Sequence, residues 1–131
     1  MKFFFFLSAL SVLLVSSCGG RGSSSSSDPG EAAIRYVRCL ADGRYGEFVR
    51  GMVSCDSASD AYKKHTIILY KQMVVAKKKE YGPLKSMRHI RSDISDGGLV
   101  ATVFLQLVYA NDSTEDMMLP MLCVDGQWRL R

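Results

Sequence analysis

The sequence predicts an α+β domain in which three helices come first and then pack on one face of a curved four-stranded antiparallel sheet. Apolar residues recur at helical spacing between residues 29 and 79, whereas beyond Pro83 they alternate with a period of two. The dipeptide Asp125-Gly126 is a strong hairpin signal within the alternating part. The chain has 131 residues, 47% of them hydrophobic and 23% charged, which fits one small domain and excludes a multidomain enzyme.

The first two helices are predicted over residues 29–41 and 45–53. Asp28 or Gly30 can start the first helix, and Pro29 suits an early helical position. The pair Asp42-Gly43 breaks the helical pattern. A link over residues 54–59 then supplies the cap of a third helix.

The third helix, over residues 57–79, is predicted to be amphipathic. The arc that we expect to face the core carries Ala61, Tyr62, His65, Leu69, Gln72, Met73 and Ala76. On the opposite, lysine-rich side lie Ile67, Tyr70 and Val74. Two interpretations of these three stay open: another helix covers them, or they form a docking surface with a basic rim for a partner protein or an anionic membrane.

Four strands are predicted after Pro83. The first is expected to bury Leu84, Ile90 and Ile94 and to end at residues 96–98. The second, over residues 99–109, is apolar on both faces and is predicted to be covered on both. The third covers residues 117–124, where Pro120 implies an edge or a bulge, and the fourth covers residues 127–131.

The N-terminus has the pattern of an export signal, because Lys2 precedes an apolar run over residues 3–15. That run, about 20 Å long as a helix, is shorter than the ~30 Å hydrocarbon core of a bilayer. It ends in Val15-Ser16-Ser17-Cys18, which resembles the lipobox of bacterial lipoproteins. The resemblance implies cleavage after residue 17 and fatty acylation of Cys18. An ordinary cleaved signal with an incidental cysteine is the alternative.

Residues 18–28 are predicted to be a flexible Ser/Gly-rich tether, and residues 29–131 a single domain. Lipoproteins with Asp after the lipidated cysteine tend to stay in the inner membrane, whereas here Gly19 follows Cys18. By that resemblance the protein is expected in the cell envelope, anchored to the outer membrane, with its periplasmic or surface side undetermined.

A second resemblance concerns residues 29–131. The Asp42-Gly43-Arg44-Tyr45 break, the long third helix and the closing Asp-Gly-x-Trp-x-Leu hairpin look like the nuclear transport factor 2-like (NTF2-like, or cystatin-like) cone. Within the proteins that have this cone, the chain is similar to the small bacterial lipoproteins grouped as domain of unknown function 4878. The superfamily contains isomerases, dehydratases, transport factors and non-enzymatic modules, so the resemblance implies a fold and leaves the function open.

Three residues are candidates for ligand binding: His65 on the expected core arc, Tyr109 at the end of the second strand, and Arg88. His89 is expected on the surface. Asp93, the one acid within the predicted strands, points away from the expected core, so no inward carboxylate and no catalytic residue are predicted. The histidine spacing makes no metal motif, and the sequence implies no cofactor. The mature formal charge of +3 is too modest to imply nucleic acid.

The number of cysteines limits which disulfide bonds the protein can form. Acylation of Cys18 leaves Cys39, Cys55 and Cys123, an odd number. In an antiparallel helix pair Cys39 and Cys55 would be offset by about 10 Å, beyond the ~7 Å that a bridge allows. A bridge therefore requires the second helix to be shorter or steeply tilted.

Together these observations predict a lipid-anchored, non-enzymatic envelope module that binds a small apolar ligand or an envelope protein. The alternative is an isomerase- or lyase-like enzyme that uses His65 with Tyr109 in a pocket between the third helix and the sheet. Self-association through the sheet, giving a homodimer, is a further alternative.

Overall fold

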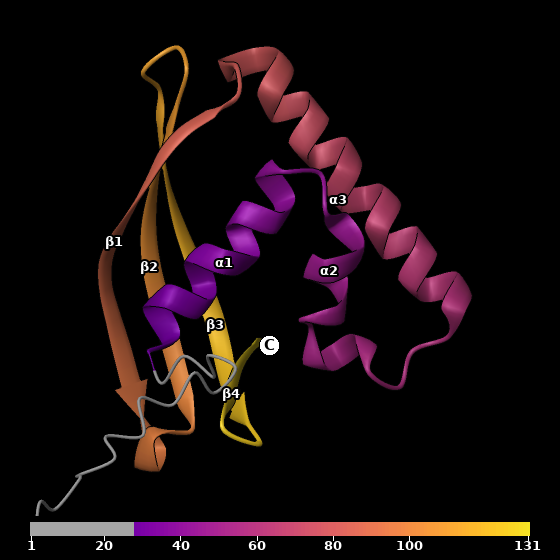
Figure 1. Ribbon diagram of the computed structural model, residues 1–131, viewed down its shortest axis with the longest axis vertical. Helices are drawn as coiled ribbons and strands as arrows, with labels where there is room; N and C mark the ends of the chain where they lie inside the picture. The colour runs from indigo at the N-terminus through magenta and orange to yellow at the C-terminus, as the bar shows by residue number, and fades with distance from the viewer. Residues whose placement is uncertain (1–27) are drawn as a thin grey trace, which may run out of the picture.

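The computed structural model describes residues 28–131, and these form three helices followed by a four-stranded antiparallel sheet (Figure 1). The predicted fold class is therefore confirmed. The predicted signal peptide, Cys18 and the tether up to residue 27 lie outside the described residues.

The first and third helices begin at capping residues that the sequence marks. α1 (Pro29–Ala41) starts at Asp28, whose side chain accepts a hydrogen bond of 2.9 Å from the backbone N–H of Gly30. α2 (Tyr45–Arg50) ends three residues earlier than predicted, and a short 3₁₀ helix (Val53–Cys55) follows. α3 (Asp60–Tyr81) starts at Ser59, whose hydroxyl accepts from the N–H of Tyr62 at 3.2 Å.

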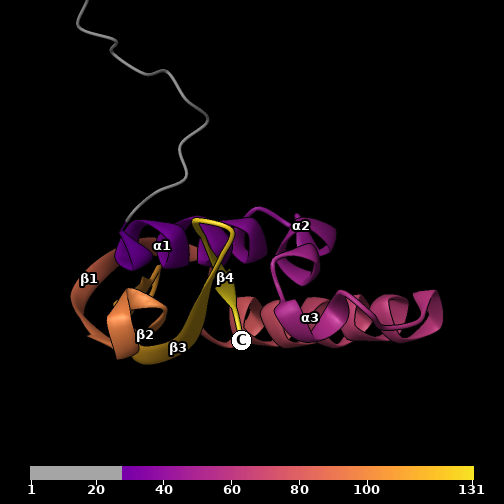
Figure 2. The ribbon, with the colours of Figure 1, turned by 90° about the horizontal axis from the view of Figure 1, so that it is seen from below.

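The strands follow one another in the sheet in chain order: β1 (Leu84–Ser95), β2 (Val100–Tyr109), β3 (Thr114–Val124) and β4 (Gln127–Leu130). α1 lies across one face of this sheet, which we call the inner face, while α3 extends away from the sheet (Figures 1 and 2). Among the described residues, no helix is both long enough and apolar enough to cross a membrane.

The core forms between α1 and the inner face and continues to α2, which packs on α1 and α3. Ala32, Ala33 and Val37 of α1 pack there with Leu105 of β2 and Met121 of β3. A hydrogen bond of 3.0 Å from the Tyr36 hydroxyl to the backbone carbonyl of Trp128 ties α1 to β4. The helical layer and the end of the sheet are thus held as one unit.

β2 is buried on one face only, so the prediction that both its faces are covered is wrong. Its inward side chains are buried, namely Ala101, Val103, Leu105, Leu107 and Tyr109. The alternate side chains Thr102, Phe104, Gln106 and Val108 are half-buried. Their neighbours in the sheet shield them partly, whereas the helices of the described chain pack on the inner face.

The predicted buried face of β1 is right for Leu84, which packs against the core, and wrong for Ile90 and Ile94. Ile90 and Ile94 are 47% and 54% exposed, whereas Met87 is half-buried. The register shifts between residues 84 and 86 and again between 89 and 91, and each extra residue interrupts the alternation of faces. As a result the ring of His89 lies against α1: a Cβ atom at Gly30 would be 2.8 Å from its Nε2.

The side of α3 that faces the core is opposite to the predicted one. Thr66 is buried, and Ile67, Tyr70 and Val74 pack against the core, so the first of the two interpretations of these apolar residues is confirmed. The arc expected to be buried is instead exposed. His65 is among its exposed residues.

Candidate functional site

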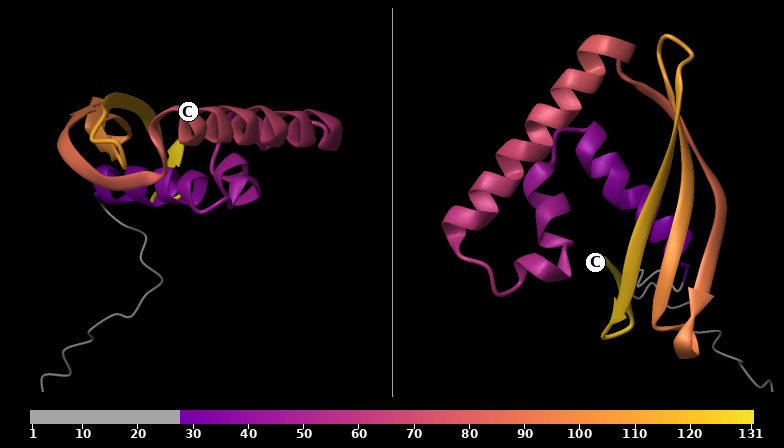
Figure 3. Two further views of the ribbon diagram at one scale, coloured as in Figure 1. Left: turned by 90° about the horizontal axis from the view of Figure 1, so that it is seen from above. Right: turned by 180° about the vertical axis from the view of Figure 1, so that it is seen from behind.

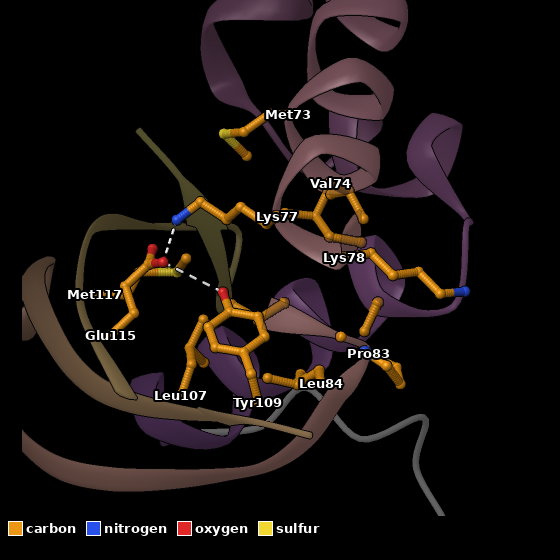
Figure 4. Close-up of a pocket in the computed structure, with 14 residues that line it drawn as sticks. Met73, Val74, Lys77, Lys78, Pro83, Leu84, Leu107, Tyr109, Glu115 and Met117 are labelled. Carbon is orange, nitrogen blue, oxygen red and sulfur yellow. Dashed lines mark hydrogen bonds and ion pairs between the residues drawn. The ribbon is translucent and has the colours of Figure 1, made fainter. Parts of the chain in front are cut away.

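A cavity of about 120 Å³ opens between α1, the C-terminal half of α3 and the inner face of the sheet (Figure 4). Most of its wall is apolar. The lining residues are Val37, Leu40 and Ala41 of α1, Met73, Val74, Lys77 and Lys78 of α3, residues 82–84, Leu107 and Tyr109 of β2, and Glu115 and Met117 of β3. Ala41, Met73 and Lys78 are exposed, so they mark the mouth of the cavity.

The turn after α3 closes one end of this cavity. Gly82 has a φ of 82°, a left-handed value that glycine adopts without strain, and its N–H caps the carbonyl of Lys78 at 2.9 Å. The carbonyl of Pro83 then accepts from the N–H of Ala110 at 2.9 Å. A Cβ atom at Gly82 would lie 2.9 Å from that of Ala110, so this close approach of the turn to the end of β2 requires glycine.

Three polar side chains meet at one wall of the cavity. Lys77 forms an ion pair with the Oε2 atom of Glu115, and the Tyr109 hydroxyl donates to the same oxygen at 3.3 Å (Figure 4). The side chains of Lys77 and Glu115 are 33% and 27% exposed. The partners come from three different elements, so their meeting depends on the packing of α3 over the ends of β2 and β3.

Tyr109 is the most perturbed titratable group of the site. Burial raises its pKa to about 12, and the negative charge of Glu115 and the hydrogen bond to it act in the same direction. The ring of Tyr81 lies beside it, with the two ring centroids 5.5 Å apart. Tyr109 therefore keeps its proton at neutral pH and can donate a hydrogen bond, but it is a poor proton acceptor.

The three residues predicted to bind a ligand do not come together. Tyr109 lines the cavity, as the prediction requires of it. His65 is exposed on α3, so the prediction that it faces the core is wrong. Arg88 is exposed on β1, opposite Gln106 on the outer face of the sheet. Neither His65 nor Arg88 lines the cavity.

Sequence reasoning missed Glu115, and the expectation that no carboxylate points inward is wrong. β3 begins at Thr114, whereas the third strand was predicted to begin at Met117. Glu115 lies opposite Leu107, one of the inward residues of β2. The alternation through Met117 and Leu119 continues back to Glu115, and this periodic signal could have placed the carboxylate on the inner face.

The possible metal ligands and the cysteines in the part of the chain that the structure describes form neither a metal cluster nor a disulfide there. No group of three or more His, Cys, Asp or Glu side chains there could hold a metal ion. Cys39, Cys55 and Cys123 are free, so the Cys39–Cys55 bridge is not formed although α2 is short. Burial raises the pKa of the Cys39 thiol, which disfavours the reactive thiolate.

Comparison with known proteins supports the fold. No family model matches the chain, and no curated protein matches it. Its structure is similar to that of a Campylobacter jejuni protein named "Putative NTF2-like transpeptidase", with a TM-score of 0.64 and 19% sequence identity. The similarity covers 79% of this chain and 96% of the other. At this level of identity the likeness concerns the fold, and the chain has an NTF2-like fold, as the resemblance of its sequence to the cone implied.

Proposed function

We propose that this protein is a lipid-anchored cell-envelope module that binds a small, mainly apolar ligand in the cavity between α1, α3 and the sheet. The observation that carries the proposal is the apolar cavity itself, with Lys77, Glu115 and Tyr109 grouped at one wall. Ligand sites of this kind combine an apolar lining with a few polar groups that orient the ligand.

The size of the cavity limits the ligand. An engineered apolar cavity of about 150 Å³ in another protein admits benzene. A cavity of about 120 Å³ therefore suits a single small ring or the end of a short chain. Lys78 is exposed at the mouth, so an acidic group on the ligand could remain near solvent beside this ammonium group.

A binding role fits the polar cluster better than proton transfer does. Tyr109 holds its proton, and one oxygen of Glu115 is already engaged by both Lys77 and Tyr109. The alternative enzyme was expected to use His65 with Tyr109, and His65 does not line the cavity.

The anchoring part of the proposal is supported by the sequence of residues 1–28. The stretch from Val15 to Cys18 resembles a lipobox, and a Ser/Gly-rich segment follows it. Two or three acyl chains, at ~0.8 kcal/mol per buried methylene, would hold the protein stably at a membrane. Gly19 favours the outer membrane by the same resemblance.

Small aromatic probes test the cavity. We expect benzene and phenol to raise the melting temperature of the protein, because a ligand that binds the folded state stabilises it by mass action. The variant Ala41→Trp places an indole at the cavity mouth, on a residue that is exposed, and should abolish the shift. The matched control Ala61→Trp, at an exposed position on α3 away from the cavity, should keep it. Equal shifts in both variants would show that the probes bind elsewhere.

Acylation is tested separately. Native mass spectrometry of the detergent-extracted protein should show the mass of acyl chains, and Cys18→Ser should remove that mass and release the protein from the membrane fraction. If the variant stays membrane-bound with an unchanged mass, the anchoring proposal is wrong while the ligand proposal stands. The same measurement reports the oligomeric state.

A further inference from the structure

We propose that the exposed face of α3 docks directly on the surface of an anionic lipid bilayer. The starting observation is where apolar side chains remain uncovered. Five of the nine exposed large apolar residues among the described residues lie on this one helix: Tyr62, Ile68, Leu69, Met73 and Val75, which are 39–53% exposed. Such a concentration marks an interaction surface.

The packing of α3 decides which residues face outward. Tyr70 packs edge-on against Phe48 of α2, with ring centroids 4.7 Å apart, and Val74 packs against the core beside it. By helical spacing Ile68 and Val75 lie on the opposite arc and point away from the molecule, whereas Met73, at the mouth of the cavity, lies at the border of the exposed face. This face differs from the surface around Ile67, Tyr70 and Val74 that the sequence suggested, because those residues are covered.

Lysines flank the exposed apolar residues. Lys64, Lys71 and Lys78 are exposed and follow one another at intervals of seven residues, as Ile68 and Val75 do. Lys71 comes three residues after Ile68 and four before Val75, so its side chain lies beside both on the helix surface. We call this combination of apolar residues and lysines the lysine-flanked face.

Charge selects the kind of partner. α3 contains six lysines against Asp60 and Glu80, a formal charge of +4. The rest of residues 28–131 has 9 basic and 11 acidic side chains, a formal charge of −2. The positive charge of the domain is thus concentrated on one helix. Two copies of this face would repel each other, whereas a negatively charged surface would be attracted.

The shape of the face favours a bilayer over an acidic protein. Its apolar residues extend from Tyr62 to Val75, about 20 Å along the helix. α3 lies at the outside of the molecule and projects beyond the sheet, so a flat surface can reach its length (Figures 2 and 3). Isoleucine and valine side chains can then enter the headgroup region while the lysine ammonium groups stay at the level of the phosphates.

The test uses the chain from residue 18 onward with Cys18→Ser, so that neither the apolar run over residues 3–15 nor acyl chains bind the vesicles. The core of the described part of the chain is formed within residues 28–131, so we expect this chain to keep that fold. In flotation assays it should bind phosphatidylcholine vesicles that contain phosphatidylglycerol and should not bind pure phosphatidylcholine. High salt should weaken the binding.

Variants test whether the lysine-flanked face, and not another part of the surface, binds the vesicles. A lysine near an anionic surface contributes about a factor of five, so Lys64→Gln/Lys71→Gln should lower the partition coefficient about 25-fold. Ile68→Gln/Val75→Gln should also lower it, since it removes the apolar part. The control Arg35→Gln/Arg50→Gln removes two exposed charges from α1 and α2 and should bind as the parent does. Far-UV circular dichroism checks that each variant is folded.

The possible results decide the proposal. It is overturned if the parent chain does not float with anionic vesicles, or if the lysine variant and the arginine control lose binding equally. Binding to soluble poly-glutamate without binding to vesicles would assign the face to an acidic protein and would also overturn the proposal. Because the chain is unacylated and no small ligand is added, neither result depends on acylation or on the cavity.

Discussion

The titration of Tyr109 provides a quantitative test of the polar cluster in the cavity. Its pKa is raised from 10.0 to about 12 in the folded protein, first by burial and then by Glu115. As the pH rises, the unfolded chain therefore loses this proton before the folded chain does. The contribution of Tyr109 to stability is complete below pH 10 and is lost as the pH rises from 10 to about 12.

The size of this effect follows from the two pKa values. The difference between 10.0 and about 12, at 1.36 kcal/mol per pKa unit, corresponds to roughly 2–3 kcal/mol. Tyr109 is 7% exposed, and water at the cavity mouth screens part of the interaction, so we expect about 2 kcal/mol. At neutral pH, Tyr109→Phe loses the 3.3 Å hydrogen bond to Glu115, which costs about 0.5–1.5 kcal/mol.

Urea unfolding from neutral pH to pH 12 measures both effects. Trp128, the single tryptophan and a buried residue, reports unfolding by its fluorescence. Tyr109→Phe should be less stable than wild type at neutral pH and should lose less stability above pH 10. Tyr62→Phe, at a side chain that is 53% exposed, should follow the wild-type profile. If the Tyr109→Phe and wild-type profiles stay parallel up to pH 12, the assigned environment of Tyr109 is wrong.

Two further predictions concern stability away from the cavity. Gly51→Ala should destabilise the protein by about 1–3 kcal/mol in urea unfolding, because its Cβ would overlap the ring of Tyr36. Gly46→Ala, with no atom within 4 Å of the added carbon, should be neutral or stabilising, and similar losses in both variants would contradict the packing. Asp56→Asn should destabilise at neutral pH, because the Arg129 guanidinium hydrogen-bonds both Asp56 oxygens at 2.6 Å and lowers the pKa of that carboxyl. Because the pKa of Asp56 is lowered in the folded protein, the wild type should be more stable than Asp56→Asn above about pH 4, and this difference in the free energy of unfolding should disappear as the pH falls further. A stability difference that does not change with pH would refute this role.

Local chemistry explains why much of the fold could be predicted. Asp28 and Ser59 cap their helices through side-chain oxygens that accept backbone N–H groups a few residues away. Gly82 ends α3 through its own backbone conformation. Pro120 was predicted at an edge or a bulge, and it lies just beyond the β3 residues 121–124 that pair with β4. Each of these effects acts within a few residues, so it is visible in the sequence.

The burial of each face was decided by tertiary packing. α3 has apolar residues around most of its circumference, so its periodicity could not tell whether Tyr70 or Leu69 faces the core; contact with Phe48 selects Tyr70. In β1, bulges that depend on pairing with β2 placed the ring of His89 beside Gly30 of α1, although His89 stays exposed as predicted, and left Ile90 exposed.

The candidate site depends most on the tertiary structure. Lys77, Tyr109 and Glu115 belong to three elements, and in the sequence each has the pattern of an ordinary helix, strand or turn residue. The sequence by itself determined the order of the elements, most of their ends and the export signal that we predict, because capping, helix breaking and periodicity act over short distances. Only the tertiary structure brought these three side chains to one wall of a cavity and left the lysine-flanked face uncovered, because burial depends on which distant surfaces meet.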